Sequence, residues 1–366
     1  MSSSQPQALF PPQTPAYILS FQFSSWYPHF SRHSIKSTII RPLTQEFRDY
    51  LDADGVFVPE GSEDVPVQSA LSDDEESDEE ADQSADHPSF AFPEMDTRIR
   101  DCVQEYGAVF PKLNFSSPKD ASWILPSSSP LKCTSPSDVY MLLKSSDFIT
   151  HDLSTDNVFE GCEDALSTPY DIELVLRKWY PVDCSRELRC FVRQNVLVGV
   201  SQRDTNYYEF LNEPATYNSI AAAVQEFWEK NIRRSQYWQS TPDYTFDFLL
   251  TRDLSRGHIL DFNPYAPRTD PLLFTYEELA ELLEARMPAE TSSASTLPNG
   301  DQHHAAPSLL PEFRVIDSRA HPAATSSAPA HQHNMVPFEA LSLSSGRDIE
   351  EFANIWKEEI RKSAAE

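Results

Sequence analysis

Five short runs rich in β-branched and aromatic residues lie between residues 173 and 263, and they exclude an all-helical fold. The runs cover residues 173–179, 188–194, 196–202, 245–251 and 258–263. Gln194-Asn195 predicts a tight turn between the second and third runs. A five-residue turn centred near Leu254 predicts that the last two runs form a second hairpin.

Helical patterns interrupt these runs. They cover residues 137–144, 218–237 and 276–285. Thr275 and Glu278 form a capping-box pattern at the start of the last one, in which each side chain satisfies a free backbone amide. Because the strands and helices do not alternate strictly, the sequence predicts an α+β fold.

Charge is distributed unevenly along the 366 residues. The chain has 29 basic and 57 acidic side chains, a net charge of −28, and residues 49–97 contain 17 acidic side chains and no lysine or arginine. Residues 1–15, 61–88 and 288–337 have too little apolar surface to offset chain entropy, so we expect disorder there. The folded core then spans residues 16–287, interrupted by the acidic insert. Residues 338–366 form a C-terminal docking segment with a helix that binds the core or a partner.

Composition excludes several classes of protein. We find no cluster of Lys and Arg of the kind that binds nucleic acid, and the eight glycines form no phosphate-binding glycine loop. No apolar stretch reaches the roughly 20 residues of a membrane helix. Five cysteines without a C-x-x-C pair indicate a reducing compartment. We therefore expect a cytoplasmic monomer that binds neither nucleic acid nor membrane.

Two carboxylates and an amide converge on the second hairpin. If its turn centres on Leu254, Asp247 lies opposite Asp261, and Asn263 shares the face of Asp261 because side chains alternate along a strand. Carboxylates this close repel each other when buried, and a divalent cation such as Mg²⁺ removes the conflict. The alternative is that Asp261 caps the turn before Pro264 and Asp247 pairs with an arginine.

Two further clusters carry candidate binding residues. Arg177, Lys178 and Trp179 end one strand, with Glu187 and Arg189 soon after, and such cations and aromatics can hold phosphates and a base. The alternative is a surface strand with cross-strand ion pairs. Lys112, Phe115 and Ser117 lie in a second segment, which is either a loop that closes over phosphates or a solvated turn.

These same residues lie in stretches that resemble the cell division cycle protein 123 family. The resemblance includes Phe23-Ser24-Ser25-Trp26-Tyr27-Pro28 and Asp261-Phe262-Asn263-Pro264. It also includes residues 34–37, 110–121, 144–149, 176–179, 187–192, 201–204 and 272–274. Residues 338–361 look like the C-terminal segment of the family. The matches follow family order over about residues 17–285.

The resemblance implies an ATP-grasp-like fold, in which two lobes hold ATP and Mg²⁺ between them. It also implies an assembly chaperone that binds the gamma subunit of eukaryotic translation initiation factor 2. By resemblance, Lys112, Phe115 and Ser117 belong to the phosphate and base side of the pocket. Five more residues supply the adenine hinge and polar contacts: Arg177, Lys178, Trp179, Glu187 and Arg189. Asp247, Asp261 and Asn263 hold the metal and complete the ATP site.

Two other functions remain open. One is an ATP-grasp carboxylate-amine ligase, which needs a second-substrate site that we do not identify in the sequence. The other is an acidic interaction protein without a nucleotide, which the polar hairpin disfavours. The chain departs from the family pattern at Phe115, where the family commonly has tryptophan, and in its long tail over 288–337.

Overall fold

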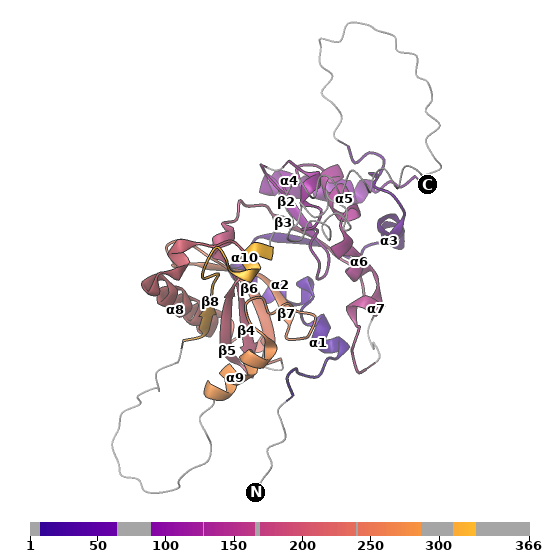
Figure 1. Ribbon diagram of the computed structural model, residues 1–366. Helices are drawn as coiled ribbons and strands as arrows, with labels where there is room; N and C mark the ends of the chain where they lie inside the picture. Colours follow the sequence, from indigo (N-terminus) through magenta and orange to yellow (C-terminus); the bar gives the residue numbers. More distant parts are fainter. Residues whose placement is uncertain are drawn as a thin grey trace, which may run out of the picture.

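The computed structural model describes residues 8–63, 89–126, 128–164, 169–238, 241–286 and 310–326, and it shows two lobes, each built around its own sheet (Figure 1). The antiparallel sheet of the smaller lobe has the order β1-β3-β2, with β1 (Ser37–Ile40), β2 (Val109–Lys112) and β3 (Leu174–Lys178). The sheet of the larger lobe has the order β7-β6-β4-β5-β8, with β4 (Glu187–Arg193), β5 (Val196–Gln202), β6 (Tyr244–Leu250), β7 (Gly257–Pro264) and β8 (Glu312–Arg314). The predicted α+β class is confirmed.

Helices cover both sheets. In the smaller lobe they are α3 (Gln45–Asp52), α4 (Pro93–Tyr106), α5 (Pro136–Lys144), α6 (Asp147–Leu153) and α7 (Thr155–Val158). The others are α1 (Pro15–Leu19), α2 (Phe23–Phe30), α8 (Pro214–Asn231), α9 (Tyr276–Arg286) and α10 (Pro322–Ser326). None of the described helices is long and apolar enough to span a bilayer.

The helix predictions are confirmed for α5 and α9, and the capping box forms, with Thr275 N–H bonded to the Glu278 carboxylate and Glu278 N–H to the Thr275 hydroxyl. The predicted helix over 218–237 is wrong at both ends. It begins at Pro214, whose fixed φ suits the first turn, and ends at Asn231, before a separate 3-10 turn at Gln236–Trp238.

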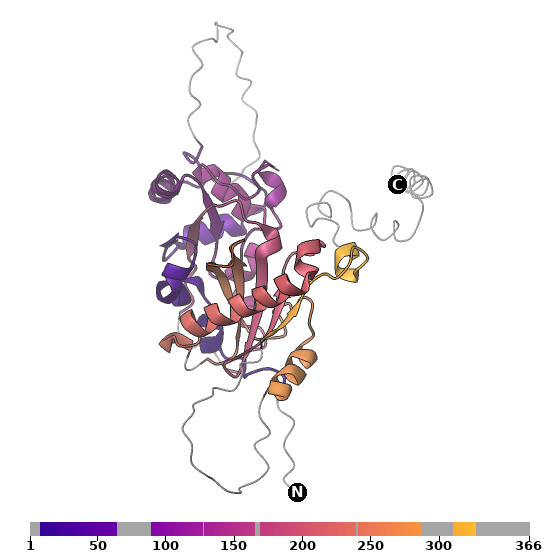
Figure 2. The same cartoon turned by 90° about the vertical axis from the view of Figure 1, so that its left-hand side faces the viewer.

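The larger sheet has two different faces. Leu188, Cys190 and Val192 of β4 pack in one cluster with Val224 and Trp228 of α8, which crosses that face (Figure 2). The opposite face is divided along β4. Phe191 packs under α9 with Phe274, while Glu187 and Arg189 lie on this face at the start of β4, where Arg189 binds Asp247 of β6. Alternation along one strand therefore supplies both a core and a polar surface.

Helix α2 joins the lobes. Trp26 and Phe30 lie against Phe262 of β7, each with ring centroids 5.2 Å apart. At the other end of the helix, the buried carboxylate of Glu173 accepts hydrogen bonds from the backbone N–H of Ser24 at 2.9 Å and from the side-chain amide of Gln22 at 3.1 Å. Glu173 immediately precedes β3, so a carboxylate from the smaller lobe satisfies the free backbone amide of Ser24 at the start of α2.

Both predicted hairpins form. Gln194 and Asn195 have φ values of 49° and 58°, as a two-residue turn between β4 and β5 requires. Leu254 has a φ of 58° in the turn between β6 and β7, and Asp247 lies opposite Asp261, as predicted. The register shifts immediately beyond this pair.

Two predictions of disorder are wrong in part. Within the predicted linker 288–337, β8 pairs in parallel with β5 and buries Phe313, because three closely spaced apolar residues in 313–316 are enough to extend the sheet. Within the predicted N-terminus 1–15, Phe10 packs on Tyr276 with ring centroids 4.7 Å apart, and Arg193 donates to the carbonyl of Ala8 at 2.7 Å.

The acidic insert was predicted over 61–88. Its first residues are described, and Ser62 is buried with its hydroxyl bonded to the Pro59 carbonyl at 2.6 Å. The rest of the insert (64–88), the remainder of the linker (288–309 and 327–337) and the C-terminal docking segment (338–366) lie outside the described residues.

Candidate functional site

The polar face of β7 meets the smaller sheet at two points. The Lys112 ammonium of β2 lies 2.9 Å from a carboxylate oxygen of Asp261. The guanidinium of Arg177 on β3 donates to the carbonyl of Leu260 at 2.8 Å. The register shift opposite Asp247 and Phe248 leaves Leu260 without a paired residue in β6, which frees its carbonyl for Arg177. These contacts place three predicted residues, Lys112, Arg177 and Asp261, at the boundary between the lobes.

The cations on the smaller lobe are buried and have unused donors. The side chain of Lys112 is fully enclosed, and Arg177 is 6% exposed. Nε and Nη2 of Arg177 have no hydrogen-bond partner among the residues that the structure describes. Buried donors without a partner are rare, and an anion is the group that best satisfies a guanidinium. The predicted alternative of a surface strand is therefore wrong for Arg177.

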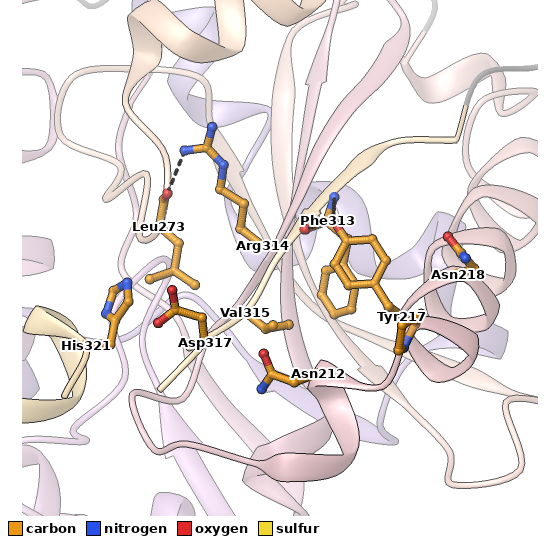
Figure 3. Close-up of a pocket in the computed structure, with 10 residues that line it drawn as sticks. Asn212, Tyr217, Asn218, Leu273, Phe313, Arg314, Val315, Asp317 and His321 are labelled. Carbon is orange, nitrogen blue, oxygen red and sulfur yellow. Dashed lines mark hydrogen bonds between the residues drawn. The ribbon is translucent and has the colours of Figure 1, made fainter. Parts of the chain in front are cut away.

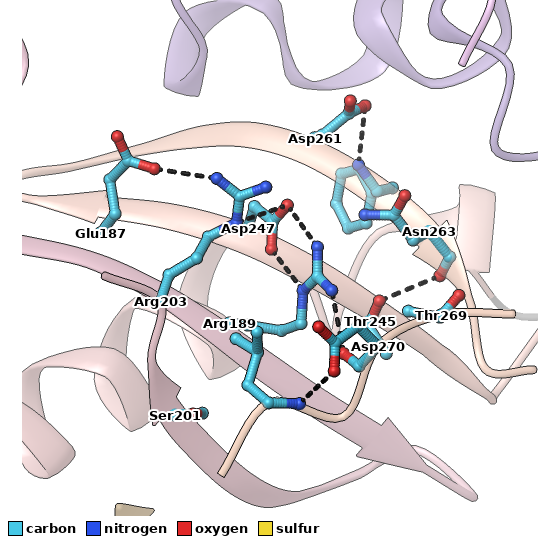
Figure 4. Close-up of polar contacts among 12 residues, drawn as sticks. Glu187, Arg189, Ser201, Arg203, Thr245, Asp247, Asp261, Asn263, Thr269 and Asp270 are labelled. Carbon is cyan, nitrogen blue, oxygen red and sulfur yellow. Dashed lines mark hydrogen bonds and ion pairs between the residues drawn. The ribbon is translucent and has the colours of Figure 1, made fainter. Parts of the chain in front are cut away.

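Two arginines neutralise Asp247 on the larger sheet (Figure 4). Arg189 binds both oxygens of this carboxylate at 2.8 and 3.0 Å, and Arg203 lies 3.4 Å from it. Arg203 also pairs with Glu187 at 3.1 Å. Burial alone would raise the pKa of Asp247, but the two arginines hold it well below its usual range. The alternative in which Asp247 pairs with an arginine is therefore what the structure shows.

The predicted metal ligands share one face. Asp247 and Asp261 are opposite each other in the ladder, and Asn263 follows two residues after Asp261 (Figure 4). No three His, Cys, Asp or Glu side chains gather as a metal site within the described ranges. Mg²⁺ commonly takes one or two protein carboxylates and completes its shell with water and phosphate oxygens. The residues fit an ion that arrives with a phosphate ligand, and the metal site stays a prediction.

Two charged residues at this site were not predicted. Arg203 directly follows β5 and lies two residues after Ser201. Its backbone amide donates to the Glu187 carbonyl at 3.0 Å. Lys119 is exposed at the edge of the cluster, where neighbouring protein and the charge of Arg203 lower its pKa, while Glu187, Asp247 and Asp261 oppose this shift. Both lie in stretches that carry the family resemblance, which is the signal that could have found them.

The charges at this site do not balance. Five cationic side chains, Lys112, Lys119, Arg177, Arg189 and Arg203, gather with four carboxylates, those of Glu187, Asp247, Asp261 and Asp270. The cluster therefore has an excess of one positive charge, and its cations Lys112 and Arg177 are buried. A polyphosphate complements this excess, and a neutral ligand does not.

The segment after β2 is anchored to α6. The buried carboxylate of Asp152 accepts the amides of Phe115 and Ser116 at 2.8 and 2.9 Å and the Ser116 hydroxyl at 2.8 Å. In return, Asp120 accepts the Asp147 amide at the start of α6 at 2.7 Å. The segment is therefore a fixed loop and not a solvated turn.

Phe115 packs between the cores of the two lobes, beside the charge cluster. Ser117 contributes a backbone contact, in which its carbonyl accepts the Lys119 amide at 2.8 Å.

Lys178 and Trp179 make their contacts away from the charge cluster. The Lys178 ammonium lies 5.3 Å from the ring of Tyr180, and the indole of Trp179 donates to the Pro130 carbonyl at 3.1 Å. Strand β3 ends at Lys178, so the alternation that predicted a shared face for Arg177 and Trp179 does not extend to Trp179. Their roles at a hinge stay predictions.

Apart from the charge cluster, a cavity of about 710 Å³ lies beside β8 (Figure 3). Its walls include Asn212, Tyr217, Leu273, Phe313, Arg314 and Asp317. Arg314 is already paired with Glu278 at 2.8 Å and donates to the Leu273 carbonyl at 3.0 Å. Because its arginine is neutralised, this cavity is less suited to a phosphate ligand than the cluster between the lobes.

The chain is similar over most of its length to a family model, to several named proteins and to a solved structure. A model of the D123 family matches residues 26–344. Proteins named translation initiation factor eIF2 assembly protein include one from Sclerotinia sclerotiorum, 36% identical over 95% of this chain and 88% of that protein. One from Xenopus laevis is 42% identical over 72% of this chain and 77% of that protein. The structure of Cdc123 from Schizosaccharomyces pombe is 32% identical, with a TM-score of 0.61, over 84% of this chain and 99% of that one.

Proposed function

The chain belongs to the D123 family, and from this premise we propose that it is an assembly factor for translation initiation factor 2 that binds ATP and Mg²⁺ between its lobes. The relatives with the assembly name cover nearly the whole chain, which supports a shared role. The proposed partner is the gamma subunit. We propose that the protein acts as a cytoplasmic monomer and uses ATP as a ligand, without modifying a small molecule.

The unpartnered guanidinium edge of Arg177 is the observation that carries the nucleotide proposal. It is buried between the lobes, within the cluster of five cations and four carboxylates. Leaving a charged donor buried and unsatisfied destabilises a fold unless a ligand satisfies it. Among common cellular ligands, the triphosphate of ATP supplies the required negative charge and several acceptor oxygens.

Each lobe contributes different groups to the proposed site. Lys112 and Arg177 approach from the smaller sheet, while Arg189 and Arg203 approach from the larger one. Asp247, Asp261 and Asn263 would hold Mg²⁺, which when bound neutralises phosphate charge. Groups on both lobes that bind one ligand fix the orientation of the lobes, and thereby the shape of any surface that spans them.

The charge of the chain fits a basic protein partner. With 57 acidic and 29 basic side chains it attracts positive surfaces, and this attraction is screened over about 8 Å at physiological salt. We therefore expect binding to the gamma subunit to weaken as salt rises. A pull-down with and without ATP, analysed by mass spectrometry, identifies the partner without assuming it.

Calorimetry tests the nucleotide site directly. The full chain is titrated with ATP in the presence of Mg²⁺, and we expect saturable binding at one site. Lys112→Ala removes a buried cation and should weaken binding at least tenfold, because charged hydrogen bonds contribute roughly 1.5–3 kcal/mol. Lys230→Ala is the control, since Lys230 lies in the last turn of α8, which packs on the opposite face of the larger sheet. No binding by the unaltered chain would refute the proposal.

The ligase alternative makes a different prediction in the same assay. A carboxylate-amine ligase releases ADP and phosphate in proportion to a ligated product, so turnover depends on a second substrate. No observation among the described residues specifically favours such a substrate. We expect ATP to bind without stoichiometric product formation.

A further inference from the structure

Two buried cations share the ring of Phe23. The Lys112 ammonium lies 5.1 Å from the ring centroid, and the central carbon of the Arg177 guanidinium lies 5.5 Å from it. Phe23 and Lys112 are fully buried, and Arg177 is nearly so. Both cations are therefore within the distance at which an aromatic ring attracts a positive charge, and burial strengthens that attraction.

The fold fixes this arrangement from both sides. Lys112 lies opposite Val175, and Arg177 follows two residues after Val175, so the two cations share a face of the smaller sheet. Phe23 is the first residue of α2, where its amide donates to the Asn114 carbonyl at 3.0 Å. Tyr27, one turn later, stacks on its ring at 4.9 Å.

An aromatic ring at this place attracts the two cations without occupying their N–H donors. A carboxylate would attract both cations, but it would also neutralise them and occupy their N–H donors. The ring attracts them through its quadrupole and leaves the donors free. Lys112 donates to Asp261 and Arg177 donates to Leu260 through Nη1, while Nε and Nη2 of Arg177 stay without a partner among the described residues.

We propose that Phe23 is a positioning residue of the site between the lobes, whose ring holds Lys112 and Arg177 side by side as a receptor for the phosphate chain of the ligand. This inference rests on the proposed nucleotide function and specifies which part of the ligand the two cations recognise. When the attraction of the ring is weakened, the like-charged side chains separate. A polyphosphate must then bring them together again at the expense of its affinity.

Fluorinated phenylalanines test the proposal, because fluorine lowers the negative charge of the ring face while largely keeping its shape. Position 23 of the full chain is occupied by phenylalanine, 3,5-difluorophenylalanine or pentafluorophenylalanine. Calorimetry then measures the affinity for inorganic tripolyphosphate and for ATP with Mg²⁺. We expect both affinities to fall stepwise with fluorination, on the order of tenfold for the pentafluoro ring.

Phe21 provides the matched control. It is as buried as Phe23 and packs on Tyr17 and Trp238, with ring centroids 5.0 and 5.4 Å away, and no cation of the described residues lies over its ring. The same series at position 21 should leave both affinities within about twofold, which separates the electrostatic role of Phe23 from a general effect of ring fluorination on packing.

The outcomes separate the inference from the proposed function. Unchanged tripolyphosphate affinity across the Phe23 series, or an equal loss at position 21, overturns the positioning role. A loss for ATP but not for tripolyphosphate also overturns it, because the ring would then act on the base. A wild-type chain that binds neither probe refutes the nucleotide proposal itself, and the inference with it.

Discussion

Replacing Asp261 by asparagine separates two effects of this carboxylate on ligand binding. In the structure it pairs with the enclosed ammonium of Lys112 at 2.9 Å, so it competes with any phosphate that approaches the same lysine. If it is also a Mg²⁺ ligand, it attracts the metal that accompanies the phosphate. The two effects have opposite signs. Asparagine removes the negative charge on which both depend and keeps the shape of the side chain.

The size of each effect follows from the contacts. Lys112 stays charged in the variant, so Asp261→Asn replaces an ion pair by a hydrogen bond from the ammonium to a neutral amide oxygen, a loss on the order of 1 kcal/mol. Without metal, ATP should therefore bind about fivefold more tightly to the variant. With Mg²⁺, loss of a charged ligand should weaken binding by at least tenfold, because metal coordination depends strongly on ligand charge.

Calorimetry with Mg²⁺ and with a chelator measures both changes on one preparation. Asp253→Asn is the control, because Asp253 lies in the turn of the same hairpin, where its carboxylate bonds to Thr251 and Ser255. The reasoning is refuted if Asp261→Asn shifts the two affinities equally, since the carboxylate would then play no specific part toward the metal.

Three further changes test individual contacts. Asp247→Asn removes the carboxylate that Arg189 binds and leaves Arg203 paired with Glu187 alone, and it should lower the free energy of unfolding by about 3–5 kcal/mol in urea. Because the pKa of Asp247 is depressed in the folded chain, its contribution to wild-type stability is complete above about pH 4 and should be lost as the pH falls further, as acid unfolding curves of wild type and variant would show. Asp152→Ala removes the acceptor of the Phe115 and Ser116 amides, so hydrogen exchange at Phe115 should accelerate and ATP affinity should fall; unchanged exchange would argue against the anchoring. Tyr217→Phe removes the hydroxyl that bonds to the backbone of β8, and we expect a loss of about 1–2 kcal/mol together with faster exchange at the described strand, whereas wild-type exchange rates there would contradict this role.

The hairpin that carries the candidate metal ligands was predictable because its signals are local. Residues 251–256 join the two strands, the unpaired Leu260 brings Asp261 opposite Asp247, and alternation then decides which side chains share a face. The charges that neutralise Asp247 were not predictable in the same way. Arg189 reaches it because β4 pairs with β6, a contact between residues 58 positions apart that no local pattern encodes.

Strand β8 is an element that the local sequence pattern did not predict. Its three residues lie in a stretch whose composition predicts a linker, yet Phe313 is buried beside Val200, more than a hundred residues earlier in the chain. The hydroxyl of Tyr217 bonds to both the amide and the carbonyl of Phe313, which closes the outer edge of this strand. Tertiary contacts thus decide the structure of a segment whose own propensity is weak.

The most direct test of the account is the affinity of the full chain for the isolated gamma subunit of translation initiation factor 2, measured with and without Mg²⁺-ATP. If a ligand between the lobes fixes their orientation, the subunit should bind more tightly when nucleotide is present, and Lys112→Ala should abolish the difference. Equal affinity in both conditions, for a chain shown to bind ATP, would contradict the proposal that nucleotide controls assembly.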